Sequence, residues 1–254
     1  MRNVLVICRK ELGSYFASPI AYILLTVFGV IFGWMFWAAL GQFITYSMEM
    51  QMSGSSYPMN LNEQIIRPLL SNIAVLGLFL IPLITMRLFA EEKRSGTIEL
   101  LATSPIRDIE IVIGKWLSSL VLYTCLLLFT AINFAFLFRY GHPDWKPLLV
   151  AYLGLLLQAG GLLALGTFIS TLTKNQFVAG AVTFAVCLLL WIVGWVDYET
   201  AAWAHVLSYF SVVNHFESFA RGGLDSKDVI FYATVIFMGL FFTARSMESL
   251  RWRS

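Results

Sequence analysis

The apolar residues of this 254-residue chain gather into six blocks separated by polar stretches. A helix that crosses a bilayer needs about 20 predominantly apolar residues, and each block reaches or approaches that length. The pattern therefore predicts an all-α integral membrane protein with six transmembrane helices. The predicted helices span residues 20–40, 69–88, 112–138, 148–170, 177–196 and 229–244.

A short amphipathic segment, residues 2–18, precedes the first block. As a helix it would gather apolar side chains roughly on one side and charged ones elsewhere: Val4, Ile7, Leu12, Tyr15 and Phe16 against Arg9, Lys10 and Glu11. This pattern suits a helix in the membrane interface, although a solvated helix shares it. Ser18 and Pro19 predict a stop and a restart, because proline is tolerated at the first position of a helix. We therefore divide the chain into an interfacial helix, 1–18, and a transmembrane domain, 19–254.

Two glycines in the first block, Gly29 and Gly33, have the spacing that lets another helix approach closely. The partner helix could belong to the same bundle or to a second copy of the chain. Pro82 in the second block predicts a kink, because proline removes one hydrogen bond from a helix ladder.

The chain turns polar between the first two blocks, and residues 41–68 predict a loop of moderate length. Thioethers are soft ligands that suit Cu(I), but methionine also packs well in irregular loops. No His or Cys lies nearby, so we favour packing over metal binding for the methionines of this loop: Met48, Met50, Met52 and Met59.

The longest charge-dense stretch, which we call the charged elbow, runs from Arg87 to Lys115 between the second and third blocks. A charge in the bilayer centre costs about 2.5–3.5 kcal/mol or more, so the elbow is expected in water. Ser104 as N-cap and Pro105 as first residue predict a new helix within the elbow. Apolar residues at helical spacing predict the inward stripe of that helix: Ile109, Val112, Ile113 and Trp116.

The connections in the second half differ in character. Residues 139–147 predict a tight polar turn, and residues 171–176 predict a short loop. The long stretch 197–228 is not plainly polar, and its helical stripe predicts an interfacial or re-entrant helix before the last crossing: Trp203, Val206, Leu207, Phe210 and Val213. The segment after residue 244 predicts a basic tail.

Composition and charge narrow the function. Charged residues make up 13% of the chain, half the roughly 25% of a soluble domain, and a net charge of +2 gives no reason to expect a nucleic-acid partner. The scattered cysteines indicate neither a disulfide framework nor a zinc site, and hydrogen bonding in loops is favoured over ligation for the three histidines. These residues are Cys8, Cys125 and Cys187, and His142, His205 and His215.

The distribution of Lys and Arg predicts the orientation. With six crossings both termini lie on one side, and twelve of the seventeen Lys and Arg residues fall on that side. The positive-inside rule then places the termini and the elbow in the cytoplasm. The five on the other side are Arg67, Arg139, Lys146, Arg221 and Lys227.

Several energy sources find no support in the sequence. Apart from Arg87 and Lys115, which belong to the elbow, the six blocks carry no Asp, Glu, Lys, Arg or His, whereas ion-coupled carriers usually keep such residues at membrane depth. The chain has no phosphate-binding GxxxxGK[ST] loop and no visible selectivity filter. The elbow and the two termini remain, and such a surface suits docking to a soluble motor.

Two segments make the chain recognisable: KELGSYFASPIAY at residues 10–22 and PLITMRLFAEEKRSGTIELLATSPIRDIEIVIGKW at residues 82–116. They resemble the ABC-2 type transporter permeases, and most of all the branch with gliding-motility-associated permeases. The copper-processing permeases of nitrous-oxide respiration are more distant relatives. The resemblance covers the whole chain in topology.

This resemblance implies a transmembrane permease subunit of an ATP-driven exporter in the bacterial inner membrane, itself not an enzyme. It implies two cytoplasmic ABC ATPase subunits that hold ATP and Mg²⁺, a second permease subunit, and an accessory or periplasmic protein. The permease would bind no cofactor directly. The alternative is a membrane anchor that transmits force in an envelope or gliding-motility complex.

The resemblance also places the family's cytoplasmic coupling helix within residues 91–104. Carried over onto this sequence, the residues that would face the ATPase or shape the elbow are Glu91, Glu92, Arg94, Gly96, Thr97, Glu99 and Leu100. Ionised side chains can form strong charge-assisted hydrogen bonds with a partner. The other interpretation is a solvated charged loop.

Overall fold

A computed structural model of the protein describes residues 2–53, 60–98, 106–141, 143–195 and 209–251. These residues form helices and turns, and no strand occurs among them. The elements are α1 (Arg2–Ala17), α2 (Pro19–Met52), the π-helical η1 (Asn62–Ile66), α3 (Arg67–Thr85), α4 (Ala90–Ser95), α6 (Asp108–Tyr140), α7 (Trp145–Leu172), α8 (Gln176–Ile192), the 3-10 turn η2 (Val193–Trp195), α10 (Val212–Ala220) and α11 (Ser226–Arg251).

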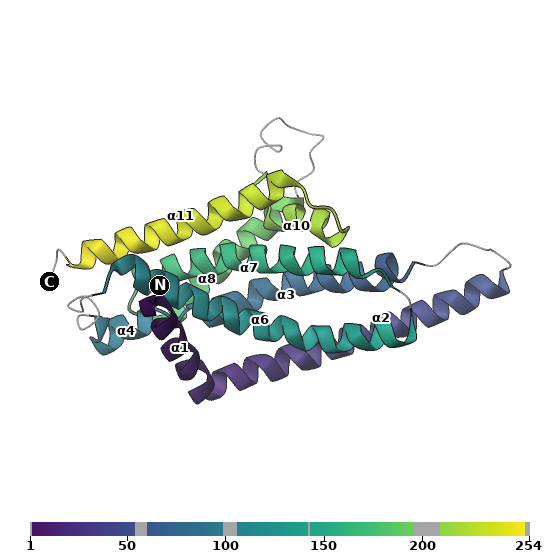
Figure 1. Cartoon of the computed structure of the whole chain (residues 1–254), viewed down its shortest axis with the longest axis horizontal. Coiled ribbons are helices and arrows are strands. Elements are labelled where there is room, and N and C mark those ends of the chain that lie inside the picture. Colours follow the sequence, from purple (N-terminus) through teal and green to yellow (C-terminus); the bar gives the residue numbers. More distant parts are fainter. Residues whose placement is uncertain (1, 54–59, 99–105, 142, 196–208, 252–254) are drawn as a thin grey trace.

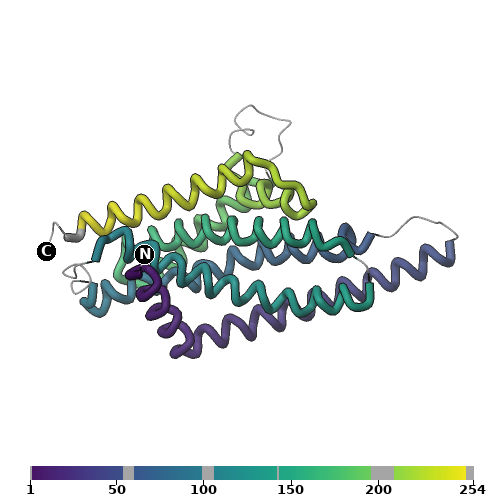
Figure 2. The backbone as a smooth tube through the Cα atoms, viewed as in Figure 1, coloured from purple at the N-terminus to yellow at the C-terminus, as the bar shows by residue number. Residues whose placement is uncertain are grey.

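Six helical segments of the described chain are long and apolar enough to cross a membrane, which confirms the all-α integral membrane fold. Helix α7 lies at the centre of the bundle and contacts α3, α6, α8, α10 and α11. The start of α1, the end of α11 and the short helix α4 lie at one end of the bundle (Figure 1). The smooth trace in Figure 2 shows α2 reaching farthest toward the opposite end.

Two glycines let helices meet closely at the end that holds α4. A Cβ added to Gly166 of α7 would lie 2.4 Å from the Thr85 hydroxyl at the end of α3. One added to Gly114 of α6 would lie 2.8 Å from Ile7 of α1. The contacts of α7 with α3 and of α6 with α1 therefore depend on the absence of a side chain.

The first crossing is longer than predicted. Helix α2 runs to Met52, so the prediction of a loop from residue 41 is wrong for its first twelve residues. The hydroxyls of Thr45 and Ser47 donate to carbonyls of the preceding turn at 3.0 and 2.7 Å, which satisfies these polar groups within a helix. Three of the methionines predicted in the loop lie on this helix: Met48, Met50 and Met52. The fourth, Met59, lies outside the described residues.

The two glycines of α2 have different surroundings. A Cβ at Gly29 would lie 3.5 Å from the Phe129 ring of α6, so this glycine packs within the bundle. Nothing lies within 4 Å of a Cβ at Gly33. The outer face of α2 is apolar and aromatic, with Trp34 and Trp37 exposed, as suits a helix facing lipid.

The predicted start of the helix after the elbow is wrong. Its predicted inward stripe holds in part, because Val112 is buried and Trp116 packs against the core, whereas Ile109 is exposed. Helix α6 begins at Asp108, with Arg107 as its N-cap, and the Glu110 carboxylate accepts the Arg107 backbone N–H at 3.4 Å. The predicted cap, Ser104-Pro105, lies outside the described residues. Ile109 of the predicted inward stripe is 45% exposed, whereas Lys115 is buried. Helix α1 packs along this part of α6, so the face of α6 that carries Lys115 is buried.

The last two helices, α10 and α11, occur in the predicted order, but their first and last residues differ from the prediction. Helix α10 precedes the last crossing, but it begins at Val212, so Phe210 lies before it and is exposed. The stripe residues Trp203, Val206 and Leu207 lie outside the described residues. Helix α11 starts three residues earlier than predicted and takes in most of the predicted tail. Pro82 lies inside α3, three residues before its end.

Candidate functional site

The charged elbow begins with a turn at residues 86–89 and continues as the six-residue helix α4. Gly96 ends this helix in the left-handed region, with φ +73°. A residue with a Cβ is disfavoured there, so the sharp exit from α4 depends on glycine.

A buried ionic cluster, which we call the Lys115 hub, holds α4 against two other helices. The Lys115 ammonium on α6 lies 2.8 Å from a Glu92 oxygen on α4 and 3.0 Å from a Glu11 oxygen on α1. It also donates to the Leu88 backbone carbonyl at 2.8 Å. The Phe89 ring covers the ammonium at 5.2 Å, and Lys115 is only 1% exposed. The hub therefore joins α1, the turn, α4 and α6 through one side chain.

A second tie links the elbow to the junction of α1 and α2. The Arg87 guanidinium donates to both Glu91 carboxylate oxygens, at 2.8 and 3.1 Å, and to the Ser18 hydroxyl at 3.4 Å. Ser18 also accepts the Ile20 backbone N–H at the start of α2, which confirms the predicted stop and restart. Glu91 is thus held in a bidentate pair.

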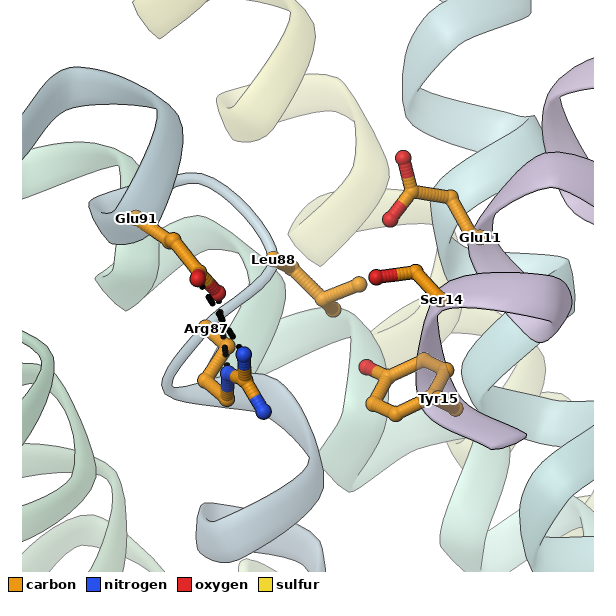
Figure 3. A pocket seen from close by; sticks show the side chains of 6 residues that line it. All are labelled: Glu11, Ser14, Tyr15, Arg87, Leu88 and Glu91. Atoms are coloured by element: carbon orange, nitrogen blue, oxygen red, sulfur yellow. Dashed lines mark hydrogen bonds and ion pairs between the residues drawn. The ribbon is translucent and has the colours of Figure 1, made fainter. Parts of the chain in front are cut away.

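A small polar cavity lies between α1 and the turn (Figure 3). Its volume is about 30 Å³, the size of about one water molecule. The Tyr15 hydroxyl donates to the Ile84 carbonyl at 2.8 Å, and burial raises the pKa of this phenol. The lining residues are Glu11, Ser14, Tyr15, Arg87, Leu88 and Glu91.

Helix α7 supplies a third tie, which the sequence analysis missed. The Ser170 hydroxyl accepts the backbone N–H groups of Phe89 and Ala90, both at 3.1 Å, and so acts as the N-cap that α4 lacks locally. The Lys93 ammonium donates to the Thr171 carbonyl on the same end of α7. A serine inside a glycine-rich apolar block carries no sequence signal for such a role.

The structure divides the residues expected to face the ATPase between an inner and an outer side of the elbow. Glu92 points inward to the hub, and Glu91 is half-buried beside Arg87. Arg94, Gly96 and Thr97 are exposed. Two lie outside the described residues: Glu99 and Leu100.

The charged residues of α1 are likewise divided. Arg9 and Lys10 are exposed, while Glu11 reaches the hub and is 85% buried. On the apolar side Tyr15 is buried, whereas Phe16 is exposed and packs edge-on against Tyr22 of α2.

A second buried ionic cluster, the His215 cluster, lies where α10 meets the start of α11. His215 Nδ1 lies 2.6 Å from an Asp228 carboxylate oxygen, and its Nε2 lies 2.8 Å from the Tyr209 carbonyl. Since a carbonyl oxygen only accepts, Nε2 carries a hydrogen. The Ser218 hydroxyl donates to the other Asp228 oxygen, and Phe231 stacks on the imidazole at 3.9 Å.

The role of His215 in hydrogen bonding agrees with the prediction, although it lies in a helix and not in a loop. His142 and His205 lie outside the described residues. Within the described ranges, no group of three or more His, Cys, Asp and Glu side chains could hold a metal ion. The site is therefore best described as a braced elbow with an exposed outer side.

Comparison with known proteins gives one family match. The model of the family described as ABC-2 family transporter protein matches residues 5–220. That range includes most of α1, the whole elbow and α10. No curated protein matches the chain.

Proposed function

Because the chain belongs to the ABC-2 family of transporter proteins, it is the membrane permease subunit of an ABC transporter, and we propose that the outer side of its charged elbow receives the ATPase. The family provides the membrane component and a separate ABC ATPase hydrolyses ATP. The chain is a multi-pass membrane protein with six candidate crossings.

The observation that carries this proposal is the two-sided construction of α4. Its inner side is tied to α1, α6 and α7 through Glu92, the Ser170 cap and Lys93. Its outer side and its exit leave Arg94 and Thr97 exposed in a helix that is too short to be stable alone. A surface that is rigidly backed yet exposed suits a partner that must push on it.

The finer assignments extend this proposal. The excess of Lys and Arg on the elbow side favours cytoplasmic termini in a bacterial inner membrane. Two ATPase subunits would then bind a pair of permease subunits, with ATP and Mg²⁺ held by the ATPases and cargo moved outward. The likeness to gliding-motility-associated permeases and a periplasmic accessory protein belong to the same proposal.

The test is copurification of the full-length tagged chain with its ATPase from native membranes in mild detergent. We expect the eluate to hydrolyse ATP, and the chain stripped of its partner not to. Arg94→Glu reverses an exposed charge on α4 and should reduce the ATPase recovered several-fold, because opposed charges at a rim weaken association.

The matched control is Arg221→Glu, an exposed arginine after α10 at the other side of the predicted membrane. It should leave ATPase recovery unchanged. Loss of the ATPase with Arg221→Glu but not with Arg94→Glu would overturn both the docking surface and the orientation. ATP turnover that responds to an envelope protein and to no cargo would favour the force-transmitting anchor over the exporter.

A further inference from the structure

We propose that Lys115 is the positioning residue that makes α1, α4 and α6 move as one body when the ATPase displaces the elbow. This inference rests on the proposed function and deepens it. It assigns a role to a buried lysine whose partners come from three separate parts of the chain.

Acceptors from three parts of the chain surround the Lys115 ammonium. A lysine ammonium has three N–H groups and no acceptor. The hub offers three acceptors within 3.0 Å: a Glu92 oxygen, a Glu11 oxygen and the Leu88 carbonyl. Two hydrogen bonds and one ion pair therefore hold the ammonium, and the three partners lie on α4, on α1 and in the turn between α3 and α4.

Lys115 also lies between two carboxylates. Glu11 and Glu92 are both about 85% buried, and the exposed Lys10 lies 3.8 Å from Glu11 at the rim. Without the buried ammonium, two carboxylates would face each other in a region of low dielectric, where like charges repel strongly. Displacement of α4 away from α1 or α6 would therefore break the most favourable contact of either carboxylate.

Lys115 lies near the start of α6. It lies in the third turn of a 33-residue helix that runs the length of a membrane crossing. Ile7 and the backbone of Val4 also pack close to Gly114, so α1 contacts α6 beside the hub. A push on α4 is therefore delivered to the base of a transmembrane helix and to α1 together.

Stability alone gives a weak reason for such a cluster. Buried ion pairs are often no more stabilising than well-packed apolar residues of the same volume. Their directional hydrogen bonds do fix one geometry, and a fixed geometry is what transmission of a displacement requires.

The experiment measures the distance between spin labels at Leu5→Cys on α1 and Ser95→Cys at the end of α4, both exposed, in the copurified complex in nanodiscs. Cys125, the one described cysteine that is not buried, is replaced by alanine. With the hub intact we expect the same narrow distance distribution without nucleotide and after vanadate trapping of ATP. A change of this distance on trapping would overturn the proposal.

The variant is Lys115→Met combined with Glu11→Gln and Glu92→Gln, which removes the ties without leaving a buried charge unpaired and so keeps the fold. We expect a broadened distribution and loss of the effect of the permease on the ATP hydrolysis rate. A narrow distribution, or an unchanged effect on the rate, would overturn the proposal. If the proposed function itself is wrong, no ATPase will copurify with the wild-type chain. The two failures are therefore distinguishable.

Discussion

The Lys115 hub and the His215 cluster are both buried and ionic, yet they join very different parts of the chain. Lys115 and Glu11 are 104 residues apart in sequence, whereas His215 and Asp228 are 13 residues apart. The hub brings together three helices at the end with both termini, and the His215 cluster closes one local corner between α10 and α11 (Figure 1).

This difference in sequence separation determines how much of the bundle each cluster holds in place. A local corner fixes the entry of α11 and leaves the rest of the bundle untouched. The hub fixes the relative positions of elements that the chain itself does not connect closely, so its loss changes the arrangement of the elbow end as a whole. The two clusters also differ in charge, because the hub sets one buried ammonium against two carboxylates and the His215 cluster has one carboxylate.

The largest expected effect comes from breaking the hub with Lys115→Met alone. Removing one partner of a buried ion pair typically costs about 3–5 kcal/mol, and here two carboxylates lose the same partner. We expect a large fall in the melting temperature of the detergent-solubilised protein, measured by fluorescence-detected size exclusion after heating.

Lys174→Met removes an exposed lysine from the loop between α7 and α8 and serves as the control. It should leave the melting temperature nearly unchanged. If the two variants melt alike, the hub is not a buried ion cluster of the kind described.

A smaller and more local effect is expected from Asp228→Asn in the His215 cluster. The amide can still accept one hydrogen bond, but the charge is lost, and one buried polar contact is worth about 1–3 kcal/mol. Hydrogen exchange should rise in α10 and in the first turns of α11, while α1 and α4 stay protected.

Asp225→Asn changes an exposed aspartate three residues away and is the matched control. Increased exchange in α4 with Asp228→Asn would contradict the view that this cluster acts locally.

The smallest of the three effects is expected from Ser170→Ala, which sharpens the comparison by loosening α4 without touching the hub. Phe89 and Ala90 would lose the acceptor of their N–H groups, at a cost of about 1–2 kcal/mol for a helix cap. We expect faster hydrogen exchange confined to residues 89–95.

Ser249→Ala, whose hydroxyl bonds only within its own helix, controls for the loss of a serine. Unchanged exchange at Ala90 in Ser170→Ala would show that the cap contributes nothing.

The sequence predicted the crossings well because long apolar blocks have few alternatives in a membrane protein. It failed at the ends of helices, where tertiary contacts decide. Helix α2 runs twelve residues past its apolar block because uncharged polar residues satisfy their hydroxyls within a helix. Helix α6 begins at Asp108 and turns Lys115 inward because α1 covers that face.

The charges in the sequence were enough to locate the elbow, but they could not predict which helices hold it in place. Charge density marked Glu92 as a surface residue, and periodicity could not reveal that its partner lies on α6, 23 residues away, with a third member on α1. The pairing of distant charges depends on which helices meet, and that information lies in the packing of Gly114 against α1. Exposed residues such as Arg94 agree with the expectation that the charges of the elbow lie in water.

The length of α2 has a consequence for the membrane surface at the end of the bundle opposite α4 (Figure 2). Its 34 residues make a rod about 51 Å long, whereas the hydrocarbon core of a bilayer is about 30 Å thick. Even when tilted, such a rod overshoots the lipid, and its tip ends at Met52, which is 90% exposed. A macromolecule that approaches this membrane surface would meet the end of α2 beyond the lipid.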